Sequence, residues 1–317
     1  MSAPTSHGHP DAPELGPPET VEVGDGLFAY VQPDGSWWIN NTGFLVDEDR
    51  VVAIDTCATE RRTRGFLNAI ATVTPKPVRT LINTHHHGDH TNGNSLVAEG
   101  STIIGHHHCR QEIVGSRIGG LDAIFGRVDW GELTPTPPTV TFSERLDVHV
   151  AGRRVELIHF PTAAHTRSDV IAWLEDEKLL YAGDLVFNGG TPFVVMGSVA
   201  GSLAAIQELR ALAPATIVPG HGGVCGIEAL DRVEAYLRFV TDLAASAKTA
   251  GETPLDAARS VDLGEFAELL DDERIVGNLH RAYAELDGVA PGAPIDYLAA
   301  FGDMLTYNGG HPLRCLA

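Results

Sequence analysis

From residue 20 onward, short apolar stretches bounded by Gly, Pro, Asn and Asp alternate with more polar segments. Stretches of four to eight residues rich in Val, Ile, Phe and Trp are typical of β-strands. They form two series along the chain, which predicts two groups of strands. The first group is expected at 26–31, 37–46, 51–54, 78–83 and 102–104, and the second at 139–142, 155–160, 170–174, 179–182 and 216–219.

A second pattern, with apolar residues at every third or fourth position, predicts helices between the strands. In one of these segments Ser202 is the expected N-terminal cap and Pro214 the stop, because proline cannot continue a helix. The helices are predicted at 61–71, 201–214, 227–240 and 264–286.

The order of these elements predicts the fold class. Strand groups and helices alternate twice, and an apolar sheet face must be buried against another layer. We therefore expect an α/β protein built as a four-layer αβ/βα sandwich with a C-terminal helical extension. Residues 1–19 are rich in Pro, Ser and His without periodicity, which is typical of a disordered tail. Residues 20–317 are expected to form one catalytic domain.

The charge of the chain narrows the classes of partner. The 317 residues contain 42 Asp and Glu against 22 Lys and Arg, so that the formal net charge is −20. Such a surface repels nucleic-acid phosphates, which argues against a nuclease. No apolar run is long enough to span a bilayer, and the N-terminus lacks the pattern of a secretory signal. The four cysteines are scattered, as in cytoplasmic proteins, and a cytoplasmic location is expected. Nothing in the sequence indicates an oligomeric state.

The strongest chemical signal follows the predicted strand at 78–83. The segment 84–90 reads Thr-His-His-His-Gly-Asp-His, which places five side chains of metal-ligand type within six positions. Neutral imidazole and carboxylate are ligands that zinc, iron and manganese accept in proteins. A lone histidine is more often a structural residue, but a cluster on a loop that leaves a buried strand predicts a metal site.

Three further residues of ligand type follow later strands. His165 lies in Ala-His-Thr, Asp184 in Ala-Gly-Asp, and His221 in Pro-Gly-His-Gly. Together with the first loop they supply enough donors for two metal ions with open coordination positions. We expect two Zn²⁺ ions, with Fe or Mn as alternatives.

These four motifs, in this order, resemble those of the metallo-β-lactamase superfamily. The resemblance implies that His85, His87 and His165 hold one metal, that Asp89, His90 and His221 hold the other, and that Asp184 bridges them. It also implies that His86 points away. Asp55 matches a position where the family has an acidic residue that supports the site. A cap or turn role for Asp55 is an equal alternative.

A metal pair of this kind activates carbonyl groups. Two metals can lower the pKa of a shared water to near 7, so that it attacks an ester, thioester, lactone or amide, while the second metal polarises the carbonyl oxygen. Asp89 is the expected catalytic residue for proton transfer. The same centre could stabilise an enolate and permit carbon–carbon bond formation.

Other side chains are candidates for the substrate pocket. Trp37, Trp38, Phe187 and Phe193 could line a pocket for a flat aromatic substrate, although packing in the core explains each of them as well. The run His106-His107-His108 is not expected to form another metal site, because no carboxylate or thiol flanks it.

Longer segments resemble a narrower group, the second-ring cyclases of type II aromatic polyketide (antibiotic) pathways such as the actinorhodin one. They are 126–132, 137–142, 191–193, 197–201, 278–283 and 307–310. This resemblance implies aldol closure of a ring on a polyketide bound to an acyl carrier protein, with thioester hydrolysis releasing the product. The alternative is a simple dinuclear-metal hydrolase of a small thioester or lactone. A binding protein that retains the metal site without turnover is a more distant possibility.

Overall fold

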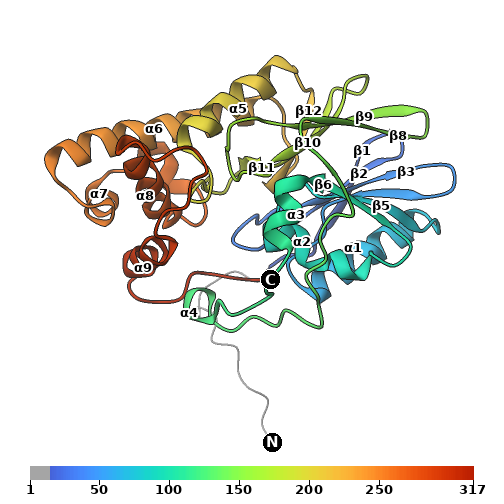
Figure 1. The fold of residues 1–317 in the computed structure, drawn as a ribbon, viewed down its shortest axis with the longest axis horizontal. Coiled ribbons are helices and arrows are strands. Elements are labelled where there is room, and N and C mark those ends of the chain that lie inside the picture. Colours follow the sequence, from blue (N-terminus) through green and yellow to red (C-terminus); the bar gives the residue numbers. More distant parts are fainter. Residues whose placement is uncertain (1–14) are drawn as a thin grey trace, which may run out of the picture.

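Two β-sheets lie face to face in the computed structural model, which describes residues 15–317 (Figure 1). The first sheet has seven strands in the order β1-β2-β3-β4-β5-β6-β7, antiparallel up to β4 and parallel from there. Its strands are β1 (Glu19–Gly24), β2 (Leu27–Val31), β3 (Thr42–Val46), β4 (Val51–Ile54), β5 (Val78–Ile82), β6 (Thr102–His106) and β7 (Val140–Phe142).

The second sheet has five strands in the order β12-β11-β10-β9-β8, antiparallel except for the β11–β12 pair. Helices cover the outer face of each sheet, so that the predicted four-layer arrangement is confirmed (Figure 1). The strands are β8 (Arg145–Val150), β9 (Arg153–His159), β10 (Val170–Leu174), β11 (Leu179–Asn188) and β12 (Thr216–Gly222).

Nine α-helices and two 3₁₀ helices are found within the described residues. On the side of the first sheet are α1 (Glu60–Val73), α2 (Gly88–Thr91), η1 (Asn92–Leu96), α3 (His107–Ile113) and α4 (Asp122–Phe125). The later helices are α5 (Val199–Ala211), α6 (Glu228–Ala250), α7 (Pro254–Ser260), η2 (Gly264–Glu268), α8 (Arg274–Leu286) and α9 (Tyr297–Tyr307).

Strand β4 shows how the sequence produces the layers. Successive side chains of a strand point to opposite faces of the sheet. Val51 and Ala53 pack against the α1 side with Phe66, whereas Val52 and Ile54 face the second sheet. A continuous apolar run is therefore the expected pattern for a strand that is buried on both faces.

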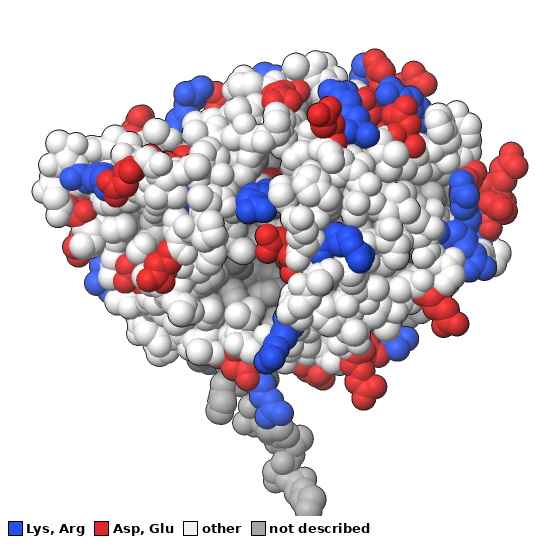
Figure 2. Space-filling view, viewed as in Figure 1, with Lys and Arg blue, Asp and Glu red and all other residues white. Residues whose placement is uncertain are grey.

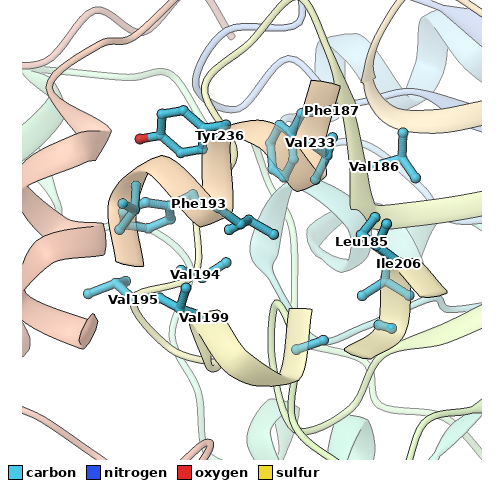
Figure 3. Close-up of a cluster of buried hydrophobic side chains, with 14 of the residues drawn as sticks. Leu185, Val186, Phe187, Phe193, Val194, Val195, Val199, Ile206, Val233 and Tyr236 are labelled. Atoms are coloured by element: carbon cyan, nitrogen blue, oxygen red, sulfur yellow. The ribbon is translucent and has the colours of Figure 1, made fainter. Parts of the chain in front are cut away.

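The outer face of the second sheet packs on the later helices in a single large core. Figure 3 shows part of it, where Phe187 and Val186 of β11 lie close to Val233 and Tyr236 of α6. The same core continues into α8 and α9. The predicted C-terminal helical extension is thus packed onto the catalytic fold.

Several predicted elements differ from the observed ones. The strand predicted at 139–142 as a member of the second group is β7, which pairs with β6 in the first sheet. The strand expected at 37–46 begins only at Thr42, because the chain turns at Trp38, whose φ is +66°. The helix expected at 201–214 begins at Val199, and Ser198 rather than Ser202 caps it, since its Oγ accepts a hydrogen bond from Gly201 N at 2.9 Å.

The helix expected at 264–286 is broken into η2 and α8. Leu270 forms an extended bridge to Gly190, with Leu270 N donating to Gly189 O (3.0 Å) and Thr191 N donating to Leu270 O (2.9 Å). A backbone engaged in this way cannot be helical, although its apolar pattern suits a helix.

The predicted tail lies largely outside the described residues, which begin at residue 15, and it stays a prediction. Residues 15–18 contain no helix or strand, and β1 begins at Glu19. No helix within the described residues is both long and apolar enough to cross a membrane.

Candidate metal centre

The first group of candidate ligands is held where β4 and β5 end. Asp55 follows β4, and its carboxylate accepts hydrogen bonds from Thr84 N (2.8 Å) and Thr84 Oγ1 (2.6 Å). This fixes the start of the loop that carries His85 and His87. The short helix α2 then turns Asp89 and His90 back toward the same point, and both are buried.

The second group comes from the other sheet. His165 follows β9, Asp184 lies in β11, and His221 lies in β12. Glycine allows these strands to approach the first loop: Gly183 has φ +52°, and a Cβ there would lie 2.9 Å from Thr84 Cβ. A Cβ on Gly220 would overlap Asp184 Oδ1. The small residues beside the ligands are therefore required by close backbone approach.

All seven predicted ligands converge on two neighbouring positions. In each group, one donor atom per residue lies within 4.8 Å of all the others. Asp184 belongs to both groups, with Oδ1 at 3.0 Å from His90 Nε2 and Oδ2 at 3.3 Å from His165 Nε2. The groups are His85, His87, His165 and Asp184, and Asp89, His90, Asp184 and His221.

The protonation of these side chains suits cation binding. Burial is the largest cause that lowers the pKa of His87 to about 3 and of His165 to about 4, so both imidazoles are neutral donors. Burial acts in the same direction on His221, but the Asp184 and Asp89 carboxylates together outweigh it and raise the pKa of His221 to about 9. These two carboxylates thus favour positive charge at the position that a cation would take.

Several donor atoms make no regular hydrogen bond within the protein. His85 Nε2, His90 Nε2 and Asp184 Oδ1 are buried in this state, with the last two facing each other at 3.0 Å, although buried polar atoms are normally satisfied. Histidine nitrogen and carboxylate oxygen in sets of four are the donors that zinc takes in proteins. The residues present therefore fit two Zn²⁺ ions.

The opposite ring nitrogens of the histidines are anchored, as is usual for metal ligands. His90 Nδ1 donates to Asp55 Oδ2 (2.8 Å), and His165 Nδ1 donates to Phe193 O (2.6 Å). His87 Nε2 contacts Met196 Sδ at 3.2 Å, which leaves Nδ1 facing the site. His86 turns away toward Ser168 Oγ (3.0 Å), as expected from the resemblance.

An apolar pocket opens on both donor groups. It has about 780 Å³ of empty space, including its mouth, and it contains the four aromatic residues predicted from the sequence, Trp37, Trp38, Phe187 and Phe193. The rings pack edge to face: Trp37 lies 4.9 Å from Phe193 and 5.2 Å from Phe125 between centroids. The full lining also includes His87, Gly88, Asp89, Leu121, Phe125, His165, Asp184, Met196, His221, Arg274 and Phe301.

Five of these lining residues were not predicted. Leu121, Phe125, Met196, Arg274 and Phe301 lie far apart in the sequence and match no motif of the metal site. Helix α8 brings Met196 into place, because Asn278 Oδ1 accepts from Val194 N (2.9 Å) and Arg281 donates to Val195 O (2.8 Å). Among these five residues, only Arg274 could have been suspected from the sequence, because it is a charged residue within an amphipathic helix.

The histidine run at the end of β6 is placed outside this centre. His106 Nδ1 accepts from His108 N (3.3 Å) at the start of α3, and its Nε2 donates to Ser143 O (3.2 Å). Both nitrogens of His106 are therefore engaged within the protein. One donor atom from each of His106, His107 and His108 nevertheless lies within 4.8 Å of the others, so the expectation that this run holds no metal stays a prediction.

Comparison with known proteins decides the family. The sequence profile described as "Metallo-beta-lactamase superfamily" matches residues 35–221, which is more than half of the chain and includes all seven ligands. The chain belongs to the metallo-beta-lactamase superfamily. As a member of this superfamily with an intact donor set, it is a metal-dependent enzyme.

The curated relatives have several different activities. The chain is 31% identical to 2,4-dinitroanisole O-demethylase subunit alpha of Nocardioides sp. over an alignment of 251 residues. This alignment covers 78% of the chain and 66% of the relative, so the chain spans just under two thirds of that relative's length. It is 30% identical to hydroxyacylglutathione hydrolase of Polaromonas sp. over an alignment of 236 residues, and this alignment covers 69% of the chain and 78% of the relative.

Solved structures confirm the fold. A metallo-beta-lactamase from Pontibacter korlensis superposes with a TM-score of 0.58 at 20% identity, covering 70% of this chain and 99% of that one. A double mutant of the sec-alkyl sulfatase PisA1 gives a TM-score of 0.65 at 15% identity, covering 89% of this chain and 53% of that one. At such identities the likeness concerns the fold alone.

Proposed function

We propose that the protein is a two-zinc enzyme acting on an aromatic polyketide thioester carried by an acyl carrier protein. It would close a ring by aldol condensation and cleave the thioester. The observation that carries this proposal is the apolar, aromatic pocket that opens directly on both donor groups. Its aromatic walls suit the flat rings of a polycyclic acyl chain.

The ligands divide between two ions. His85, His87 and His165 would hold one Zn²⁺, Asp89, His90 and His221 the other, and Asp184 would contact both. When bound, the metal pair supplies Lewis acidity to a carbonyl oxygen and lowers the pKa of water.

Asp89 is the residue that we assign to proton transfer. Its side chain lines the pocket, and Oδ2 lies 3.2 Å from His221 Nε2. Burial opposes its ionisation, but His90 and His221 outweigh this effect and lower the pKa of Asp89 to about 2. The ionised carboxylate can accept a proton from the reacting carbon or from water, and return it to the leaving group.

The pocket walls position the substrate. Trp38, Phe187 and Phe193 come from three separate segments and exclude water from the acyl chain. Phe187 stacks on His221 with ring centroids 5.1 Å apart and an interplanar angle of 9°. The reacting carbonyl is thereby held beside the ligands.

The second candidate is hydrolysis of a small thioester or lactone without ring formation. The similarity to a hydroxyacylglutathione hydrolase favours it. The lining of the pocket fits a small charged thioester less well. Its one Lys or Arg side chain is Arg274, whose Nη2 is paired with Asp271 Oδ2 at 2.7 Å.

The decisive experiment uses a pantetheine-bound polyketone in which the first ring is already formed. Thiol release and product mass are followed with the zinc-loaded enzyme and with Asp184→Ala, which removes the carboxylate shared by both donor groups. A new dehydrated ring together with thiol release, both lost in the variant, supports the proposal. Thiol release with only the uncyclised acid supports the simple hydrolase, and no reaction at all contradicts both.

A further inference from the structure

A second polar cluster lies next to the metal centre and takes no part in the proposed metal binding. His106 stacks on His159 of β9 with ring centroids 3.6 Å apart and an interplanar angle of 14°. His107 and His108 follow at the start of α3, with ring centroids 4.1 Å apart. Arg167 reaches this cluster, and its Nη2 lies 3.1 Å from His108 Nδ1.

Arg167 is held in place although it is exposed. Its aliphatic stem packs on the backbone of Gly292, where an added Cβ would lie 2.6 Å from Arg167 Cγ. His108 Nδ1 lies 3.1 Å from the Arg167 guanidinium and 2.8 Å from Gln111 Oε1. The structure thus presents a guanidinium and an imidazole side by side.

Arg167 is not neutralised by a carboxylate. Within residues 15–317 no carboxylate lies within 4.0 Å of its side-chain nitrogens, whereas Arg145, Arg153, Arg154, Arg210 and Arg238 have carboxylate partners. An exposed, unpaired guanidinium can receive an anion even on a chain of net charge −20.

Arg167 favours an anion over a metal beside His108. One donor atom from each of His106, His107 and His108 lies within 4.8 Å of the others, but both nitrogens of His106 are already bonded within the protein. The Arg167 guanidinium, 3.1 Å from His108, would repel a cation. Arginine is a common donor to phosphate oxygens.

The position of the cluster relates it to the substrate. Arg167 is only two residues beyond the predicted ligand His165, and Ser168 holds His86 of the metal loop. Phe125, Phe193 and Phe301, which line the apolar pocket, are not part of this cluster. Figure 2 shows side chains of both charges, basic and acidic, at the edge of the hollow. Because Arg167 is exposed and follows His165 closely, a substrate bound at the metal pair could extend to it.

We propose that Arg167, beside His108, binds the phosphate group of a phosphopantetheine arm, while the metal pair holds the thioester at the other end of that arm. This inference rests on the proposed function, because it assumes a pantetheine-type thioester. The chain would then recognise three parts of one substrate: the acyl chain, the thioester and the phosphate.

The test compares two thioesters of one aromatic acyl group, one on 4′-phosphopantetheine and one on pantetheine without the phosphate. We expect the wild-type kcat/KM to be about tenfold higher for the phosphorylated thioester, as for one charge-assisted contact. In Arg167→Gln this ratio should fall toward one. Arg79→Gln is the matched control, since Arg79 is also exposed and donates to a backbone carbonyl, Gly100 O at 3.2 Å. It should keep the wild-type ratio.

A binding measurement separates this inference from the proposed function. Titration calorimetry with free 4′-phosphopantetheine should show binding to the zinc-loaded wild type and to Arg79→Gln, and at least tenfold weaker binding to Arg167→Gln. If neither thioester is turned over but this difference is found, the proposed function fails and the phosphate site stands. Equal kcat/KM for both thioesters in the wild type, or equal binding by Arg167→Gln, would overturn the phosphate site.

Discussion

The Asp55 carboxylate and the His90 imidazole form a buried hydrogen bond of 2.8 Å between Oδ2 and Nδ1. The bond fixes His90 with Nε2 directed at Asp184 Oδ1, 3.0 Å away. Asp55 has φ +60°, a conformation unusual for a residue other than glycine. Of the two roles considered from the sequence, the contacts favour support of a metal ligand over a simple turn or cap.

Replacing Asp55 should weaken the metal site that contains His90. We expect Asp55→Ala to lower the affinity for the second zinc by about 10- to 100-fold, because the ring loses the partner that orients it. Competition with a zinc chelator measures this affinity. Asp55→Asn keeps one acceptor oxygen and should lose less. Equal affinity in Asp55→Ala and the wild type would refute a positioning role.

Gly220 should tolerate no side chain. A Cβ at this position would overlap Asp184 Oδ1, so Gly220→Ala should displace the shared carboxylate and reduce the bound zinc from two ions toward none. Gly223→Ala is the control, because the nearest atom to its added Cβ is Asn188 Nδ2 at 3.9 Å. Metal content after dialysis, measured by mass spectrometry, distinguishes the two. Two retained ions in Gly220→Ala would contradict the proposed role of Asp184.

Trp38 should select for aromatic acyl groups. It packs edge to face on Phe125 (5.5 Å) and Trp130 (4.8 Å) in the pocket wall. Loss of its contact area in Trp38→Ala should lower kcat/KM for an aromatic acyl thioester by about 10- to 100-fold. An acetyl thioester of the same thiol is too small to use the wall and should lose far less. A parallel loss for both substrates would show that Trp38 acts on the metal centre instead.

Glu273 should make stability depend on pH. Burial raises its pKa from 4.5 to about 6, while its Oε1 accepts from Trp37 Nε1 at 2.7 Å. Between these two values the native state binds more protons than the unfolded state, so the free energy of unfolding falls as pH rises. The resulting loss of unfolding free energy is absent below about pH 4 and reaches about 2 kcal/mol above pH 7.

Glu273→Gln removes this titration and keeps an acceptor for Trp37. Relative to the metal-free wild type, its free energy of unfolding should therefore rise by about 2 kcal/mol between pH 4 and pH 7.5. Urea unfolding of both proteins at the two pH values measures the change. A difference between variant and wild type that is the same at both values would show that Glu273 does not titrate in this range.

The metal ligands were predictable from the sequence because each lies in a short motif at the end of a strand. His85 and Asp184 are about 100 positions apart, yet strand order and family resemblance were enough to bring them together. The pocket was less predictable. Phe125 and Phe301 reach the pocket only through the packing of α4 and α9. The apolar periodicity of a sequence does not indicate which apolar residues face a cavity and which pack in the core.

Two of the errors in secondary structure have the same physical cause. Trp38 and Leu270 lie in segments whose local apolar pattern suits a regular element, but long-range contacts impose another backbone. Leu270 pairs with Gly190, and Trp38 turns into the pocket wall. Tertiary contacts outweighed local propensity at both places, of which the one at Trp38 forms part of the pocket wall.

The shared carboxylate of Asp184 has a further consequence for the whole chain. Each proposed metal takes ligands from both sheets, for example His85 and His165 in one case and His90 and His221 in the other. Bound zinc would therefore act as a non-covalent cross-link between the two halves of the molecule, and its binding energy would add to folding stability. A population of variants selected only for survival of heat in zinc-rich medium would keep these side chains, even if no substrate were ever supplied.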